Sequence, residues 1–219
     1  QQNMSQIKAI LLDFDGTLAN TTDVIIQTMF ATIKELQLPE RSYEECASTI
    51  GLRLPEVPKA LFPDIDMNPG DYETTYRRLF NIYNTEDAVK IYPNVMETLA
   101  ELKSRGFLLT IASSRSHRTL DDFVRNLNLT NTISYVLGAE DVTEGKPNPQ
   151  PVNMTLEKFN ISPEEALVVG DTVFDIEMGR NAGTKTCGVT FGNGSRESMA
   201  NADWLIDDFA DLLKIVEQY

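Results

Sequence analysis

Apolar residues along this chain follow two different spacings, and the first of them marks a buried strand. Residues 7–14 (IKAILLDF) are mostly apolar, which is typical of a parallel strand covered on both faces. After a turn at Gly16, apolar residues recur at helical spacing over residues 22–36. Residues 40–86 show no strand pattern, and four prolines divide their middle into short pieces. The pattern therefore predicts one strand followed by an all-helical block.

From residue 92 onward the spacing alternates between helical and strand-like. Such alternation is typical of strands joined by crossover helices, which place a parallel sheet between two layers of helices. Because the helical block interrupts this series after its first strand, we expect an insertion that covers the sheet. We predict an α/β fold, with a doubly wound parallel sheet built from residues 1–19 and 87–219 and an all-helical cap at 20–86. The later strands are expected at 107–112, 134–138, 166–169, 186–190 and 204–206, and the helices between them at 94–105, 118–127, 149–159, 174–181 and 209–216.

The composition of the chain narrows the partners that it can bind. The 219 residues include 33 Asp and Glu against 19 Lys and Arg, a formal charge of −14, and 42% of them are apolar. This apolar share supports a packed globular core. The acidity argues against nucleic acid or an anionic membrane, and an anionic substrate would need a metal or local cations. No apolar run is long enough to span a membrane and residues 1–6 show no signal pattern, so we expect a cytoplasmic protein.

Polar residues gather at the predicted ends of the strands. Ligands of a doubly wound sheet bind beyond the carboxyl ends of its strands, so these residues are expected to meet at one edge. Several carboxylates at one point repel each other and need a cation, and Mg²⁺ prefers such oxygen ligands. A lysine, hydroxyls and backbone N–H groups nearby would then receive a phosphoryl group. These residues are Asp13, Asp15 and Gly16 after the first strand, Ser113 and Ser114 after 107–112, Lys146 after 134–138, and Asp171 and Asp175 after 166–169.

Each of these motifs also has a purely structural explanation when it is taken alone. Asp-x-Asp-Gly at residues 13–16 is typical of a turn, and a single Lys146 is typical of a solvated surface. His117, the one histidine of the sequence, fits the surface start of a helix, and Arg115 fits a substrate contact and the surface equally well. The combination of motifs, each after its expected strand, is what indicates chemistry.

The four motifs together resemble those of the haloacid dehalogenase superfamily. They read DFDGTL at residues 13–18, ASS at 112–114, GKP at 145–147 and GDTVFD at 170–175, in the order that the superfamily has. The helical insertion after the first strand looks like the small α-helical cap of the phosphoglycolate phosphatase and β-phosphoglucomutase branch. The resemblance implies a Rossmann-like core, dependence on Mg²⁺ and an aspartyl-phosphate intermediate.

The resemblance also implies a role for each residue of the predicted site. Asp13 would be the nucleophile and a metal ligand, and Asp15 the general acid and base. Asp15 needs a raised pKa to carry a proton, and we expect like-charge repulsion in a crowded acidic pocket to supply it. The implied phosphate-binding residues are Gly16, Ser113, Ser114 and Lys146. The implied metal ligands are Asp171 and the backbone carbonyl of Asp15, with Asp175 acting either behind the direct ligands or through a metal-bound water.

The expected function is a Mg²⁺-dependent phosphatase that acts on a small phosphorylated metabolite, either phosphoglycolate or a sugar phosphate. A β-phosphoglucomutase-like phosphotransferase would use the same residues and is the alternative, and a phosphate-sensing protein on a degenerate scaffold is a third. Residues 49–53 look like the specificity loop of the branch, so Arg53 is expected to contact the substrate away from its phosphoryl group. Asp15 argues against dehalogenation, because the dehalogenases themselves lack that aspartate. The sequence does not indicate an oligomeric state.

Overall fold

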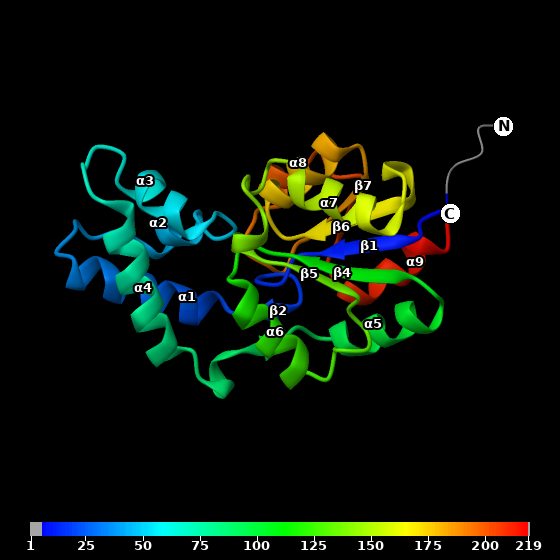
Figure 1. The fold of residues 1–219 in the computed structure, drawn as a ribbon, viewed down its shortest axis with the longest axis horizontal. Helices are drawn as coiled ribbons and strands as arrows, with labels where there is room; N and C mark the ends of the chain where they lie inside the picture. The colour runs from blue at the N-terminus through cyan, green and yellow to red at the C-terminus, as the bar shows by residue number, and fades with distance from the viewer. Residues whose placement is uncertain (1–5, 219) are drawn as a thin grey trace.

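The computed structural model describes residues 6–218, and its centre is a sheet of six parallel strands (Figure 1). β1 lies between β4 and β6, with Leu12 opposite both Ile111 and Val169. The carboxyl ends of these three strands are therefore level at one edge of the sheet. This architecture confirms the predicted α/β fold with its doubly wound sheet. In the order β5-β4-β1-β6-β7-β8, the strands are Tyr135–Leu137, Leu108–Ala112, Ala9–Leu12, Ala166–Gly170, Lys185–Val189 and Trp204–Ile206.

Helices cover both faces of this sheet because successive side chains of β1 point to opposite sides. Ile10 and Leu12 belong to a cluster with α5 (Val95–Ser104), α6 (His117–Asn126) and α9 (Leu212–Val216). Ala9 and Leu11 belong to a second cluster with α7 (Gln150–Phe159) and α8 (Val173–Ala182). All four side chains of β1 are buried, which accounts for the continuous apolar run in the sequence.

The helical block forms a unit with a core of its own, to one side of the sheet (Figure 1). Its longest helices, α1 (Thr22–Glu35) and α4 (Pro69–Tyr83), pack against each other. Tyr72 of α4 is a fully buried member of this core. Between them lie α2 (Tyr43–Ala47), a short 3₁₀ helix η1 (Leu54–Glu56) and α3 (Val57–Leu61). We call α1–α4 the cap helices; they lie beyond the edge toward which the strands point.

A two-stranded antiparallel ribbon lies where the chain passes between the sheet and the cap helices. Its strands are β2 (Ala19–Asn20) and β3 (Lys90–Ile91). The sequence did not predict this ribbon, because a strand of two residues has no periodicity to read. The ribbon ties the entry and the exit of the insertion together. The division of the chain into two domains, a core of residues 1–19 and 87–219 and a cap of residues 20–86, stays a prediction.

The remaining differences from the predicted elements concern their ends. Within the helical block, α4 begins at Pro69, where the side chain of Asn68 accepts a hydrogen bond from the Gly70 N–H (2.9 Å). The helix expected at 209–216 consists of a 3₁₀ turn, Phe209–Asp211, followed by α9. No helix in the described residues is long and apolar enough to cross a membrane. The prediction that the N-terminus has no signal pattern concerns mainly residues 1–5, which lie outside the described part of the chain.

Candidate active site

The strand-end residues converge at one edge of the sheet, as the sequence predicts. Asp13 follows β1, Asp171 follows β6, and Asp175 lies in the first turn of α8. One carboxylate oxygen from each of these three residues lies within 4.8 Å of the others. Their exposed fractions are 6%, 0% and 1%. The fold thus places three acidic groups together where little water can solvate them.

Lys146 is the cation that this cluster receives from the chain itself. Its Nζ lies 3.0 Å from Asp13 Oδ1 and 2.6 Å from Asp175 Oδ1, and its side chain is 3% exposed. Two carboxylates outweigh its one positive charge, and Asp171 has no cation within ion-pair distance in residues 6–218. The cluster therefore retains excess negative charge.

Asp171 is held by a loop rather than by a cation. The Asn193 backbone N–H donates to Asp171 Oδ2 (2.8 Å), and Asn193 Nδ2 donates to the same oxygen (3.2 Å). Thr17 Oγ1 donates to Asp171 Oδ1 (3.4 Å). At Gly16, where φ is +81°, an added Cβ would lie 2.0 Å from Asp171 Oδ2, so only glycine fits this turn.

Asp15 lies outside the group of three carboxylates and pairs with Arg115. Arg115 Nε lies 3.1 Å from Asp15 Oδ2, Arg115 Nη2 lies 2.5 Å from Asp15 Oδ1, and Thr21 Oγ1 donates to Asp15 Oδ1 (2.5 Å). Burial acts to raise the pKa of Asp15, but the charge and hydrogen bonds of Arg115 outweigh it, so the pKa is lowered. Our expectation of a raised pKa at Asp15 is therefore wrong for the free site.

The two serines after β4 have different surroundings. Ser113 is buried, and its Oγ accepts a hydrogen bond from the Arg115 N–H (3.1 Å). The Ser114 hydroxyl donates to the Gly51 carbonyl in the loop before η1 (2.7 Å). Ser114 thus links the sheet edge to the loop before η1 with its hydroxyl, and its predicted phosphate role would fall to its backbone N–H.

The chain as a whole matches known proteins over nearly its full length. A family model described as haloacid dehalogenase-like hydrolase matches residues 10–189. The chain belongs to the haloacid dehalogenase-like hydrolase family. A curated relative, pyrophosphatase PpaX of Bacillus cereus, is 33% identical over 213 residues, with 96% of this chain and 97% of the relative covered. This membership confirms the resemblance seen in the four motifs and the prediction of a phosphatase enzyme.

Solved structures of the haloacid dehalogenase-like fold superpose on both the sheet and the cap helices. A predicted phosphoglycolate phosphatase from Haemophilus somnus has a TM-score of 0.84 at 28% identity, covering 97% of this chain and 99% of the other. A haloacid dehalogenase-like protein from Bacteroides fragilis has a TM-score of 0.89 at 25% identity, covering 94% and 100%. The Rossmann-like core and the helical insertion are thus shared with these proteins.

The donor set of the cluster fits the divalent metal that the family resemblance implies. Burial, followed by the charge of Asp175, raises the pKa of Asp171 to about 6. Burial likewise raises the pKa of Asp13, with further contributions from Asp175 and the other carboxylates. Carboxylates whose charge is so disfavoured in the free protein gain most from a hard cation that oxygen atoms can hold. Asp13, Asp171 and Asp175 are therefore the residues that would hold Mg²⁺.

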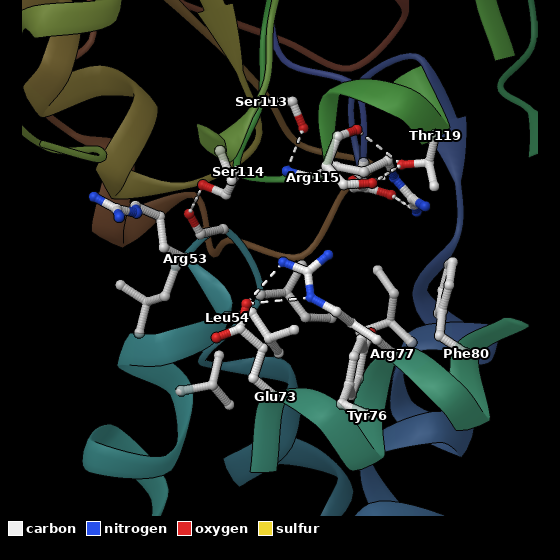
Figure 2. Close-up of a pocket in the computed structure, with 18 of the residues that line it drawn as sticks. Arg53, Leu54, Glu73, Tyr76, Arg77, Phe80, Ser113, Ser114, Arg115 and Thr119 are labelled. Carbon is white, nitrogen blue, oxygen red and sulfur yellow. Dashed lines mark hydrogen bonds and ion pairs between the residues drawn. The ribbon is translucent and has the colours of Figure 1, made fainter. Parts of the chain in front are cut away.

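A cavity of about 510 Å³ lies between the site and the cap helices (Figure 2). Asp13, Asp15 and the loop after β4 form its floor, and α1, η1 and α4 form its walls. Arg53 lies on this cavity, as its predicted substrate role requires. Its Nη1 also donates to the Thr143 carbonyl (2.8 Å), and an added Cβ at Gly145 would lie 2.3 Å from Arg53 Cδ. Arg53 therefore joins the cap helices to the loop that carries Lys146.

The sequence left the role of Arg115 undecided and gave no sign that Asn193 belongs to the site. Arg115 is not a surface residue: its side chain is 7% exposed and its guanidinium lies 5.1 Å from the ring centre of Phe80 on α4. Asn193 stands in no recognised motif, and only the Gly-Asn-Gly sequence signals a tight loop there. His117 is the predicted helix start on the surface, with Nδ1 2.5 Å from Asp141 Oδ2.

We expect the metal-free protein to lose stability as the pH rises. A free Asp has a pKa of about 3.9, so Asp171, with a pKa of about 6, binds its proton more tightly in the fold than in the unfolded chain. The stability that this proton provides is complete below about pH 4 and lost above about pH 6. In the presence of chelator, we therefore compare the melting temperatures of the wild type and of Asp171→Asn. The wild-type value minus the variant value should fall as the pH rises from about 4 to about 6.

The same protons should compete with the metal. Mg²⁺ should raise the melting temperature of the wild type more at about pH 7.5 than at about pH 5, because Asp13 and Asp171, whose pKa values are raised, give up their protons more fully at the higher pH. Thermal unfolding with Mg²⁺ and with chelator at both pH values measures this. Equal shifts at the two pH values would contradict a metal site formed by these carboxylates.

Asn193 should tune the affinity of this cluster for metal. Asn193→Ala removes one donor to Asp171 and the acceptor of the Thr22 hydroxyl bond (2.8 Å), and we expect an apparent Mg²⁺ affinity about 10-fold weaker. The measurement is the melting temperature as a function of Mg²⁺ concentration. Ser195→Ala is the matched control, since within residues 6–218 the hydrogen bonds of Ser195 stay in its own turn, to Ser198. Unchanged metal dependence in Asn193→Ala would show that the Asn193 backbone N–H and the Thr17 hydroxyl orient Asp171 without the side-chain amide.

Proposed function

We propose that the protein is a Mg²⁺-dependent phosphatase that hydrolyses a small phosphate monoester, phosphoglycolate or a sugar phosphate, through an aspartyl-phosphate intermediate. The observation that carries the proposal is the buried cluster of Asp13, Asp171 and Asp175 with Lys146, from which Asp13 reaches the floor of a cavity under the cap helices. A carboxylate nucleophile, a cation and a metal-ligand set at one point are the groups that phosphoryl transfer needs.

In the first half of the reaction, an oxygen of Asp13 attacks phosphorus and the bond from phosphorus to the alcohol oxygen breaks. Asp15 gives its proton to that leaving oxygen. Lys146 reduces the repulsion between Asp13 and the phosphate, and the backbone N–H groups near Gly16 and Ser114 orient the phosphate oxygens. Mg²⁺, when bound, supplies the positive charge that lets a dianionic phosphate approach these carboxylates.

In the second half, Asp15 accepts a proton from water, and the water oxygen attacks the phosphorus of the aspartyl phosphate. The bond between phosphorus and Asp13 breaks, which releases inorganic phosphate and restores both aspartates. The lowered pKa of Asp15 in the free site suits this base role. For the acid role, the negative charge of the incoming phosphate must raise that pKa, so Asp15 takes up its proton as substrate binds.

Pyrophosphate is a second candidate substrate. The support for pyrophosphate is the name of the Bacillus cereus relative, a pyrophosphatase that is 33% identical to this chain. The mutase alternative uses the same groups but returns the phosphoryl group to a sugar. A mutase should need a bisphosphate to prime it and should release little free phosphate, which separates it from both hydrolases.

Phosphate release from a panel of monoesters and pyrophosphate, with Mg²⁺ and with chelator, tests the proposal. A hydrolase should release phosphate from at least one monoester only when metal is present. Release that is indifferent to chelator would remove the metal from the proposal, and release from pyrophosphate alone would favour the second candidate. We further propose a cytoplasmic location and a small phosphorylated metabolite as the partner.

A further inference from the structure

In this structure the cap helices and their loops already contact the sheet edge, and the cavity is the space that remains between them. The Ser114 hydroxyl reaches the Gly51 carbonyl, Arg53 reaches the Thr143 carbonyl, and Arg115 lies against Phe80. About 510 Å³ remains in this arrangement. That volume is in the range of about 300–1,000 Å³ typical of pockets for drug-sized ligands. Compact anions such as pyrophosphate and phosphoglycolate would leave much of it filled by water.

The part of the cavity away from Asp13 is largely apolar. Tyr76 and Phe80 stack on each other with ring centres 5.8 Å apart along α4, and both line the cavity. Leu54 of η1 also lines it, and Figure 2 shows Leu54 and Tyr76 on the cap side of the space, facing Ser113 and Ser114. The apolar residues of the wall are Ile25, Met29, Ile50, Leu52, Leu54, Pro55, Val57, Tyr76 and Phe80.

Most polar side chains on these walls already have partners within the chain. Arg77 Nη2 bonds Glu73 Oε1 (2.8 Å), as Figure 2 shows, and Ser116 Oγ lies 2.9 Å from Thr119 Oγ1. Such internal pairing leaves few groups to bind the many hydroxyls of a sugar or a second phosphate. Beyond the aspartates and Arg115, the lining carries one net positive charge, which is little for a second phosphate.

We infer that the alcohol part of the substrate carries a flat apolar ring, aromatic or heteroaromatic, rather than a glycolate, a sugar or a second phosphate. The ring lies between η1 and the Tyr76–Phe80 stack, and the phosphoryl group reaches Asp13. The inference rests on the phosphatase chemistry of the proposed function, and it replaces phosphoglycolate and the sugar phosphates proposed there with a different class of monoester. It also predicts that this chain differs in specificity from the relative named a pyrophosphatase.

Two matched esters test the inference on the wild-type enzyme with Mg²⁺. 2-Phenylethyl phosphate and ethyl phosphate are both esters of primary alcohols, so they differ mainly in the ring. Burial of the ring should give the phenylethyl ester a kcat/KM at least about tenfold higher. A ratio near one would overturn the inference, as would a higher kcat/KM for phosphoglycolate, a sugar phosphate or pyrophosphate than for the ring ester.

A pair of variants tests where in the cavity the preference for the ring ester arises. Leu54→Asn places a polar group of similar size in the wall and should lower the ratio at least about threefold. Ile82→Asn makes the same kind of change on α4 at a side chain that is 61% exposed and outside the cavity, and should leave the ratio unchanged. If both variants behave alike, the ring does not lie against η1.

Binding separates this inference from the proposed function. If no ester releases phosphate, the phosphatase proposal fails, and the melting temperature of the Asp13→Asn protein with each ester still reports the fit of the cavity. Greater stabilisation by 2-phenylethyl phosphate than by ethyl phosphate would support the ring site without turnover. Equal stabilisation by the two esters would overturn it.

Discussion

Asp13→Asn should lower phosphate release by at least about three orders of magnitude, because the amide is not a nucleophile toward phosphorus. Asp13 is the one carboxylate of the site that lies at the end of β1, 3.0 Å from Lys146 and within the set that would hold the metal. The variant removes an attacking oxygen and weakens a metal ligand together. Turnover is measured as phosphate released from the best substrate of the panel.

The fold should survive this change. Burial and the neighbouring carboxylates disfavour the charge of Asp13, so neutralising it in chelator should keep or raise the melting temperature. Lys146 retains Asp175 as a partner at 2.6 Å. Asp66→Asn, the same substitution at an exposed position between α3 and α4, is the control and should change neither property. More than a few per cent of wild-type turnover in Asp13→Asn would exclude Asp13 as the nucleophile.

Asp15→Asn should slow turnover by about 10²–10⁴-fold, the usual contribution of a general acid and base. The variant keeps Asp13, so the first half of the reaction remains open to a substrate whose leaving group needs no proton. With p-nitrophenyl phosphate we expect the aspartyl phosphate to accumulate, because no base activates water. Intact-mass measurement after a rapid acid quench should show one added phosphoryl group on the peptide that contains Asp13.

The control for Asp15→Asn is Asp23→Asn, which changes an exposed acid in the first turn of α1. It should neither slow turnover nor accumulate the intermediate. The acid and base role would be wrong if Asp15→Asn continued to turn over while the Asp13 peptide stayed unmodified. Loss of the Asp15 charge also leaves Arg115 buried without an ion-pair partner in the described residues, so a lowered melting temperature is expected.

The fold class and the central site were both predictable because their signals are local or repeat along the chain. The run around β1 is continuous because all four of its side chains are buried between two layers of helices. Parallel strands bring their carboxyl ends to one edge, so residues that follow β1, β4 and β6 had to meet there. The convergence of Asp13, Asp171, Asp175 and Lys146 follows from that rule.

The electrostatic state of Asp15 could not be predicted in this way. Proximity in sequence to Asp13 suggested a shared acidic pocket, yet its side chain turns toward Arg115. The direction of a side chain within a turn depends on which partners the tertiary structure offers. A guanidinium held under the cap helices by Phe80 reverses the expected shift of the pKa.

What the sequence by itself determined is therefore the α/β class, the helical insertion and the residues available for phosphoryl chemistry, since periodicity and strand ends carry that information. The tertiary structure alone decided the β2–β3 ribbon, the hold of Asn193 on Asp171 and the apolar cavity under the cap helices. Each of these joins segments far apart in the chain. Their contacts have no spacing to read, because they arise only when packing of the sheet and the cap helices brings those segments together.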